Sequence, residues 1–194
     1  MYKYIKRILD IVLSLIAIII FIIPMIIVAI IIKVESKGPI IFKQKRIKKD
    51  KKEFYIYKFR TMRADTPKNV PTHLLQDPQT FITKSGAFFR KTSIDELPQL
   101  FNIIKGDMSI IGPRPALWNQ YDLIQKRDEN GANSIMPGLT GLAQISGRDE
   151  LEIDKKAELD GQYARSMSFI LDLKILLLTV KSVLKKDGVR EGRR

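Results

Sequence analysis

The dominant pattern in this 194-residue chain is an apolar run from residue 11 to residue 32. These 22 residues carry no charge, and only Ser14 and Pro24 interrupt their apolar character. A helix of this length can cross a hydrocarbon core of about 30 Å. The run is too long for the core helix of a small soluble domain. It predicts a membrane anchor over residues 1–35, followed by a single domain over residues 36–194.

The flanks of the run limit how the anchor sits in the membrane. A cleaved signal peptide is disfavoured, because the run exceeds the usual ~7–15 residues and ends at Lys33 without a small-residue cleavage site. Basic residues precede the run, and residues 33–60 hold 11 Lys/Arg against 3 Asp/Glu. The positive-inside rule would place both flanks in the cytoplasm, which one crossing does not allow. Because Pro24 kinks a helix, a re-entrant helix is favoured over a plain spanning helix that tolerates the proline.

Asp10 lies at the edge of the apolar run, where an unpaired carboxylate is costly. Lys6 and Arg7 precede it by one helical turn. We therefore expect a local ion pair between Asp10 and one of these two cations.

After the anchor, alternation of apolar and polar residues predicts two strands, over residues 39–44 and 53–60. The basic segment 45–52 between them is either a solvated turn or a contact with anionic lipid, and its position beside the anchor favours lipid. Residues 62–84 are polar and contain three prolines, which predicts a loop and a candidate lid.

The next element is a helix that carries two candidate catalytic residues. Apolar residues recur at helical spacing from Leu97 to Ile104, and Gly106 is a natural stop. Pro98 belongs in a first helical turn, which puts the N-cap between residues 95 and 97, with Asp95 as the best capping residue. One interpretation of Asp95 and its neighbour Glu96 is ordinary helix capping.

The second interpretation of Asp95 and Glu96 is a catalytic pair. Arg90 and Lys91 lie close by in the sequence. A helix N-terminus with neighbouring cations binds phosphate, and its positive field would keep a carboxylate ionised as a nucleophile.

Two further motifs contain arginine. Arg114 stands between two prolines in residues 112–115, after a short apolar strand. The segment is either a rigid turn with an exposed arginine or a site where the arginine binds phosphate in a bidentate manner. Residues 137–148 are rich in glycine, which lets a backbone approach a ligand closely. Their spacing fits neither a P-loop nor a dinucleotide fingerprint.

The spacing of apolar residues predicts two more helical segments. Residues 116–130 predict a helix in which Trp118, Tyr121 and Ile124 pack inward. The broad apolar face within residues 160–186 suits either a core helix or one lying in the membrane interface.

Composition limits the kinds of partner and of active or metal site that the chain can have. The net charge is +13 and the pI about 9.9, which favours polyanionic partners such as anionic lipid, nucleic acid or phosphorylated substrates. Without cysteine there is no disulfide or thiolate site, and His73 is the only histidine. Because His73 sits in a polar loop, a His/Cys zinc site and a histidine-based triad are disfavoured. No base-reading motif appears, so we expect no nucleic-acid partner.

Five motifs occur in an order typical of one family. They are Lys6, Arg7 and Asp10 before a proline-interrupted apolar helix, IYKFRTM (56–62), KTSIDELPQLFN (91–102), KGDMSIIGPRPA (105–116) and PGLTGLAQISGRD (137–149). Over nearly its whole length the chain resembles the bacterial sugar transferases of the small monotopic phosphoglycosyl transferase family. It is most similar to members that initiate capsular or extracellular polysaccharide synthesis.

The resemblance implies a predominantly helical α+β fold on the cytoplasmic face of the plasma membrane. A re-entrant, proline-kinked helix would precede a small α/β catalytic domain with interfacial amphipathic helices. The implied reaction transfers a sugar-1-phosphate from a UDP-sugar to polyprenyl (undecaprenyl) phosphate, releases UMP and requires Mg²⁺. The rival interpretation, a non-catalytic polybasic protein that binds membrane surfaces, shares the charge and the anchor. The motifs specify neither the sugar nor the oligomeric state.

The resemblance also assigns residues. Asp95 would attack the β-phosphorus, carry a covalent phosphosugar and bind Mg²⁺, and Glu96 would accept a proton or orient Asp95 or the metal. Arg114 would bind the nucleotide phosphate. Further cations would surround the diphosphate or the lipid phosphate: Lys58, Arg60, Arg90 and Arg148. Family members often have serine before the helix-breaking proline, where this chain has Ile23.

Overall fold

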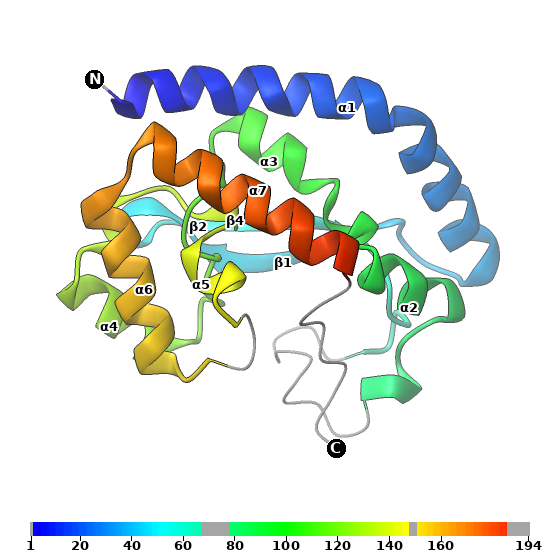
Figure 1. Ribbon diagram of the computed structural model, residues 1–194. Helices are drawn as coiled ribbons and strands as arrows, with labels where there is room; N and C mark the ends of the chain where they lie inside the picture. The colour runs from blue at the N-terminus through cyan, green and yellow to red at the C-terminus, as the bar shows by residue number, and fades with distance from the viewer. Residues whose placement is uncertain (1, 67–77, 148–150, 186–194) are drawn as a thin grey trace.

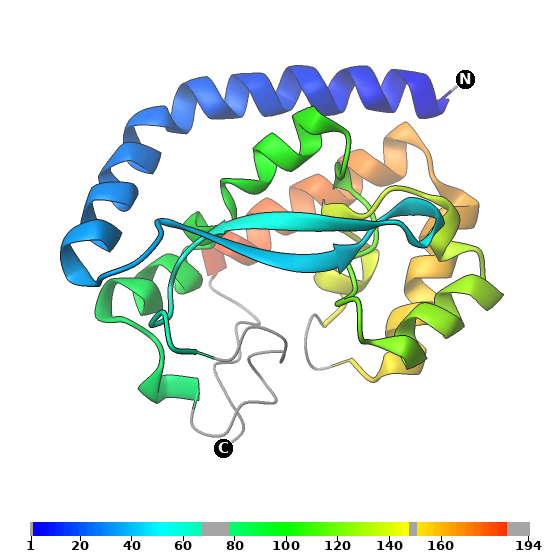
Figure 2. The ribbon, with the colours of Figure 1, turned by 180° about the vertical axis from the view of Figure 1, so that it is seen from behind.

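A computed structural model describes residues 2–66, 78–147 and 151–185, and shows one long helix arching over a small α/β domain (Figure 1). This helix, α1 (Tyr2–Glu35), is continuous over 34 residues with Pro24 inside it. It runs along one side of the domain and then bends down beside α2 (Figures 1 and 2). Within the described part of the chain, α1 is the one helix long and apolar enough to cross a membrane.

The two faces of α1 differ in their surroundings. Its inner face buries Asp10, Ser14 and, beyond Pro24, the apolar residues Met25, Val28 and Ile32. Its outer face exposes most of the isoleucines; Ile19 and Ile23 are 73% and 67% exposed. An apolar surface of this extent marks contact with lipid or protein. The helix is therefore attached to the domain on one face and presents an apolar face to lipid or protein on the other.

Strands β1 (Ile41–Ile47) and β2 (Glu53–Phe59) form an antiparallel hairpin with Ile41 opposite Phe59, which confirms both predicted strands. A 3₁₀ turn, η1 (Lys49–Lys51), joins them. Several cations of the connecting segment bind carboxylates of the domain: Lys45 with Glu53 at 3.0 Å, Lys48 with Asp107 at 2.6 Å and Lys51 with Asp128 at 2.6 Å. Contact of this segment with anionic lipid stays a prediction.

After the hairpin come the 3₁₀ turn η3 (Pro78–Thr80), α2 (Lys84–Lys91), the 3₁₀ turn η4 (Ile94–Glu96) and α3 (Gln99–Lys105). Helix α3 ends at Gly106, whose φ of 91° is left-handed, so the predicted stop is confirmed. Much of the predicted lid, residues 67–77 including His73, lies outside the described residues.

Two short strands, β3 (Ser109–Ile111) and β4 (Gly138–Thr140), pair in parallel, and β4 leads into α5 (Leu142–Ile145). A Cβ on Gly138 would lie 2.1 Å from the nitrogen of Gly112, and one on Gly141 would lie 2.1 Å from the Gly112 oxygen. Gly138 and Gly141 thus let two backbone segments meet, and the predicted approach of a ligand to this segment stays a prediction.

The remaining elements are α4 (Tyr121–Glu129), the 3₁₀ turn η5 (Ala132–Ser134), α6 (Ile153–Ser166) and α7 (Phe169–Lys185). Helix α4 starts later than predicted, and Tyr121 is 67% exposed, so its predicted packing is wrong. The predicted C-terminal helix is two helices.

Helix α7 buries Ile175 in the core, as predicted for a core helix, and exposes Ile170 and Leu177, so its placement in the membrane interface stays a prediction. Helix α7 and the hairpin lie on opposite faces of the domain (Figures 1 and 2), and the predominantly helical α+β class is confirmed.

Candidate active site

Asp95 and Glu96 lie in η4, between α2 and α3, and Asp95 is only 8% exposed. The residue at the N-cap of η4 is Ser93, and Pro98 precedes α3 without a side-chain cap. The prediction that Asp95 caps the helix is therefore wrong, because the helical turn begins at Ile94, before it. Capping does not explain a buried carboxylate at this position.

Ser93 has a left-handed backbone with φ 57°. A non-glycine residue in this region carries a conformational cost of about 1–3 kcal/mol, and such residues cluster at functional sites. The reversal at Ser93 turns the chain from α2, which carries Arg90, into η4, which carries Asp95.

Glu96 is held by cations from two other elements. The Lys58 Nζ donates to Glu96 Oε1 at 2.6 Å, and an Arg114 Nη2 donates to the same oxygen at 3.4 Å. Lys58 comes from β2, and Arg114 from the loop after β3. Residues more than 50 positions apart in the sequence thus converge on one carboxylate, and the structure brings both predicted cations to the predicted pair.

The environments of the two carboxyl groups move their pKa values apart. Burial raises the pKa of Asp95 to about 6; Lys58, Arg90 and Arg114 lower it only in part, and the charge of Glu96 adds to the rise. Burial would also raise the pKa of Glu96, but Lys58 and Arg114 outweigh it and lower that pKa to about 2. The sequence predicted that neighbouring cations would dominate at Asp95. Burial dominates there instead, because the side chain is packed inside the domain.

Asn102 fixes β2 against α3, a role that no sequence motif indicated. Its Oδ1 accepts from the Tyr57 N–H at 2.9 Å, and its Nδ2 donates to the Tyr55 carbonyl at 2.8 Å. The amide therefore takes the place of a neighbouring strand at the position just before Lys58. The only local signal was a polar residue among the apolar positions of the predicted helix.

The loop that carries Arg114 is fixed by backbone contacts. The Gly112 N–H donates to Thr140 and the Gly138 N–H donates to Pro113, both at 2.8 Å. The Arg114 side chain is 43% exposed. An arginine on a rigid loop that keeps solvent access suits recognition of an incoming phosphate.

The other predicted cations occupy different places. Arg90 lies in the last turn of α2 and lowers the pKa of Asp95, so it belongs to the site. Arg60 is buried and donates to the Lys37 carbonyl at 2.6 Å and to the Ser36 carbonyl at 2.8 Å, which caps the end of α1. These contacts hold Arg60 at the end of α1, whereas the resemblance placed it among the cations around the phosphates. Arg148 lies outside the described residues.

This arrangement can be compared with known proteins. Residues 1–186 match the family model described as bacterial sugar transferase. The chain belongs to the bacterial sugar transferase family. It is therefore a transferase, and the resemblance predicted from its motifs is confirmed.

Curated relatives of this sugar transferase include the uncharacterized sugar transferase EpsL of Bacillus subtilis, 38% identical over 187 residues, which are 96% of this chain and 91% of EpsL. The galactosyl transferase CpsE of Streptococcus agalactiae is 41% identical over 97% of this chain and 45% of its own length. The UDP-glucose:undecaprenyl-phosphate glucose-1-phosphate transferase of Escherichia coli is 38% identical over 92% of this chain and 40% of its own length. The chain thus spans nearly all of EpsL but less than half of the other two.

Polar contacts near the start of α1 join this helix to the rest of the sugar transferase domain. Arg7 donates to the carbonyls of Ile103 and Ile104 at the end of α3, at 2.6 and 2.9 Å. Asp10 accepts from the Ile110 N–H in β3 at 3.0 Å. The predicted local pair of Asp10 with Lys6 or Arg7 is wrong, because these residues bind the domain instead.

A second contact of α1 involves Asp172 of α7, which the sequence analysis missed. Tyr2 and Lys6 each donate to Asp172 Oδ2 at 2.6 Å, and Tyr163 donates to Oδ1 at 2.6 Å. The first turns of α1 thus bind three elements of the sugar transferase domain: α3, β3 and α7. Such a carboxylate within an apolar helix could have been noted as an unpaired charge that requires a partner.

The carboxyl groups of this site are the candidate ligands for Mg²⁺. Among residues 2–66, 78–147 and 151–185 there is no cluster of three or more His, Cys, Asp or Glu side chains that could hold a metal. Mg²⁺ needs no such cluster, since it commonly takes one or two carboxylates together with substrate phosphate oxygens. Asp95 and Glu96 fit that pattern, and the cations already bound to Glu96 leave Asp95 as the better ligand.

Proposed function

We propose that this protein transfers a sugar-1-phosphate from a UDP-sugar to polyprenyl phosphate, releasing UMP and forming a polyprenyl diphosphate sugar. One observation supports this most: the buried carboxyl group of Asp95 lies next to Glu96, whose carboxylate is ion-paired with Lys58 at 2.6 Å and with Arg114 at 3.4 Å. The name of the Escherichia coli relative describes transfer of glucose-1-phosphate from UDP-glucose to undecaprenyl phosphate. We assign the chain to the first membrane step of capsular or extracellular polysaccharide synthesis.

In the first step, a carboxylate oxygen of Asp95 attacks the β-phosphorus of the UDP-sugar. The bond from this phosphorus to the bridging oxygen breaks, UMP leaves with that oxygen, and Asp95 carries the phosphosugar. A carboxylate with a pKa near 6 is more basic than an ordinary aspartate, yet about 90% ionised at pH 7. Arg114, Arg90 and Lys58 neutralise charge on the transferring phosphoryl group.

In the second step, an oxygen of polyprenyl phosphate attacks the same phosphorus and releases Asp95. A phosphate monoester is largely ionised at neutral pH, so this nucleophile needs no strong base. With a pKa near 2, Glu96 is a poor proton acceptor. We therefore assign Glu96 to holding Lys58 and Arg114 in place, as its two ion pairs support.

Magnesium would bind Asp95 together with donor diphosphate oxygens and stabilise the charge on the departing UMP. The chain itself supplies the Asp95 carboxylate and the cations that Glu96 binds. Phosphoryl transfer depends on such positioning and charge neutralisation more than on strong bases, which suits a site built without histidine.

We further propose that α1 is re-entrant and that the domain lies on the cytoplasmic face. Both halves of α1 contact the same domain: Ala17 and Ile18 pack near Leu100 before Pro24, and Met25 and Val28 pack near Phe59 after it. One crossing would separate the two ends of the helix by about 30 Å of hydrocarbon. A single water-exposed domain could not then hold both ends.

The topology can be tested with introduced cysteines, because the chain has none of its own. Lys3→Cys and Lys37→Cys place a thiol on either side of the apolar run, at exposed positions. We expect neither variant to react with a membrane-impermeant maleimide in intact cells and both to react after permeabilisation. A periplasmic cysteine protein serves as the labelling control. Labelling of one position in intact cells would establish a single crossing.

The reaction itself is tested with purified protein in nanodiscs, supplied with Mg²⁺, undecaprenyl phosphate and a panel of UDP-sugars. We expect UMP release with at least one donor, and a lipid-linked sugar phosphate of matching mass. UMP release that needs no divalent cation would contradict the assignment of magnesium. No UMP from any donor would favour the rival function, a polybasic membrane-surface binding protein.

A further inference from the structure

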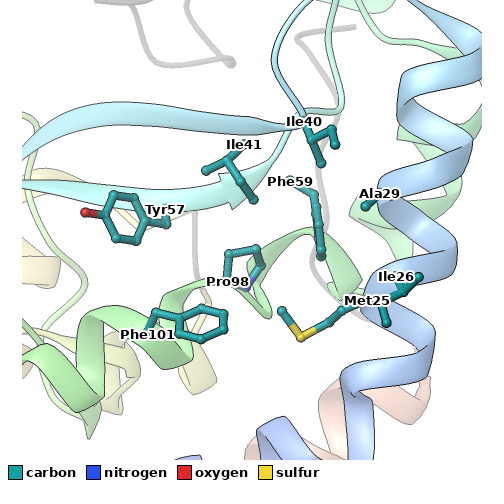
Figure 3. A pocket seen from close by; sticks show the side chains of 9 residues that line it. All are labelled: Met25, Ile26, Ala29, Ile40, Ile41, Tyr57, Phe59, Pro98 and Phe101. Atoms are coloured by element: carbon teal, nitrogen blue, oxygen red, sulfur yellow. The ribbon is translucent and has the colours of Figure 1, made fainter.

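An apolar groove lies where the anchor helix meets the hairpin and the start of α3 (Figure 3). It has a volume of about 340 Å³. Met25 and Ala29 of α1 form one wall, Ile41 of β1 another, and Pro98 and Phe101 close it toward α3. We call it the anchor groove.

The anchor groove adjoins the carboxyl pair through two elements. Tyr57 and Phe59 of β2 line it, and Lys58 between them extends from the other face of the strand, where its ammonium group binds Glu96. Pro98, at its floor, is two residues along the chain from Glu96. A ligand with a phosphate head and an apolar chain could thus place the head among the cations and the chain in the groove.

We propose that the anchor groove holds the first isoprene units of the polyprenyl phosphate acceptor, with its phosphate directed toward Asp95. The proposal rests on the proposed function and names the subsite of its second substrate. A UDP-sugar has no apolar chain to fill such a lining. One wall belongs to the helix that contacts the bilayer, so a lipid chain can enter sideways without crossing water.

The size of the anchor groove indicates its role. At about 340 Å³ it lies at the lower end of the 300–1,000 Å³ typical of ligand sites, so it holds only part of a long polyprenyl chain. Moving that part from lipid into an equally apolar groove yields little free energy. The groove therefore acts by orienting the acceptor phosphate for attack, and its obstruction should slow transfer to the acceptor and spare cleavage of the donor.

Ala29→Trp tests this by filling the groove, and Ile30→Trp is the matched control. Ile30 is the next residue of the same helix, is 58% exposed and does not line the groove. In nanodiscs we expect Ala29→Trp to keep the single-turnover burst of UMP from the donor alone and to lower kcat/KM for undecaprenyl phosphate at least tenfold. Ile30→Trp should stay within twofold of the wild type in both. A full burst with undiminished transfer in Ala29→Trp would overturn the proposal.

A cross-linking measurement decides the outcome where Ala29→Trp fails to fold. A polyprenyl phosphate analogue with a diazirine on its first isoprene unit is irradiated with the wild-type protein. We expect adducts on peptides containing Met25 or Phe101, suppressed by excess undecaprenyl phosphate and not by phosphatidylglycerol. Equal suppression by phosphatidylglycerol would show that ordinary bilayer lipid occupies the groove and would refute the proposal. No burst from the wild type would instead refute the proposed function.

Discussion

Asp95→Asn should reduce UMP release from a UDP-sugar by about 10⁴-fold or more and should abolish the covalent phosphosugar adduct. The amide keeps the shape of the side chain but is a very poor nucleophile toward phosphorus. The measurement is UMP release, together with intact-protein mass after incubation with donor alone. Glu35→Gln, at the far end of α1, removes a carboxylate away from the site and should keep activity near the wild-type level.

The same variant should be more stable than the wild type at alkaline pH. The pKa of Asp95 lies near 6 in the folded protein against 3.8 as its ordinary value. Between these values the folded state binds more protons than the unfolded state, so stability falls as pH rises through this window. Above pH 6 the cost reaches at most about 3 kcal/mol, and asparagine removes it.

Thermal unfolding in nanodiscs therefore separates the contribution of Asp95 to catalysis from its contribution to folding stability. We expect the Tm of Asp95→Asn to exceed that of the wild type at pH 8, with the difference shrinking toward pH 4. An inactive variant that is also less stable at pH 8 would mean that Asp95 serves the fold, as a capping residue does. Full turnover by the variant would exclude Asp95 as the nucleophile.

The sequence predicted those features that depend on local periodicity. The anchor follows from 22 uncharged residues, the hairpin from alternation over residues 53–60, and the end of α3 from Gly106. The convergence of Lys58 and Arg114 on the carboxyl pair was expected only from the family resemblance. No local rule brings residues from a hairpin and from a distant loop to the same carboxylate.

The failures share one physical cause, which is tertiary packing. Asp10 has two cations one turn away, yet it accepts from a backbone N–H 100 residues distant. The resemblance placed Arg60 among the cations around the phosphates, and the structure shows its guanidinium donating to backbone carbonyls just after α1. The pKa of Asp95 depends on burial, which cannot be derived from neighbouring charges in the sequence.

Lys58→Met should lower turnover at pH 7 by about 10²-fold and move the acid limb of the pH–rate profile to higher pH by about one unit. Lys58 lowers the pKa of both Asp95 and Glu96. Without it, Glu96 keeps only the longer contact to Arg114, at 3.4 Å. Both carboxyl groups then hold their protons to higher pH, and less of Asp95 is ionised at neutral pH. Breaking this largely buried pair should also cost about 2–3 kcal/mol of stability.

Lys45→Met is the matched control for Lys58→Met, because it removes the same charge from the same hairpin. Lys45 pairs with Glu53 at the surface, where an ion pair contributes about 0–1 kcal/mol, and neither residue reaches the carboxyl pair. We expect its pH–rate profile to match that of the wild type. If both variants lost activity equally with no movement of the acid limb, Lys58 would act only through the overall positive charge of the surface. If Lys58→Met alone moves the limb, the ammonium group sets the ionisation of the pair, and Glu96 serves to hold that ammonium beside the nucleophile.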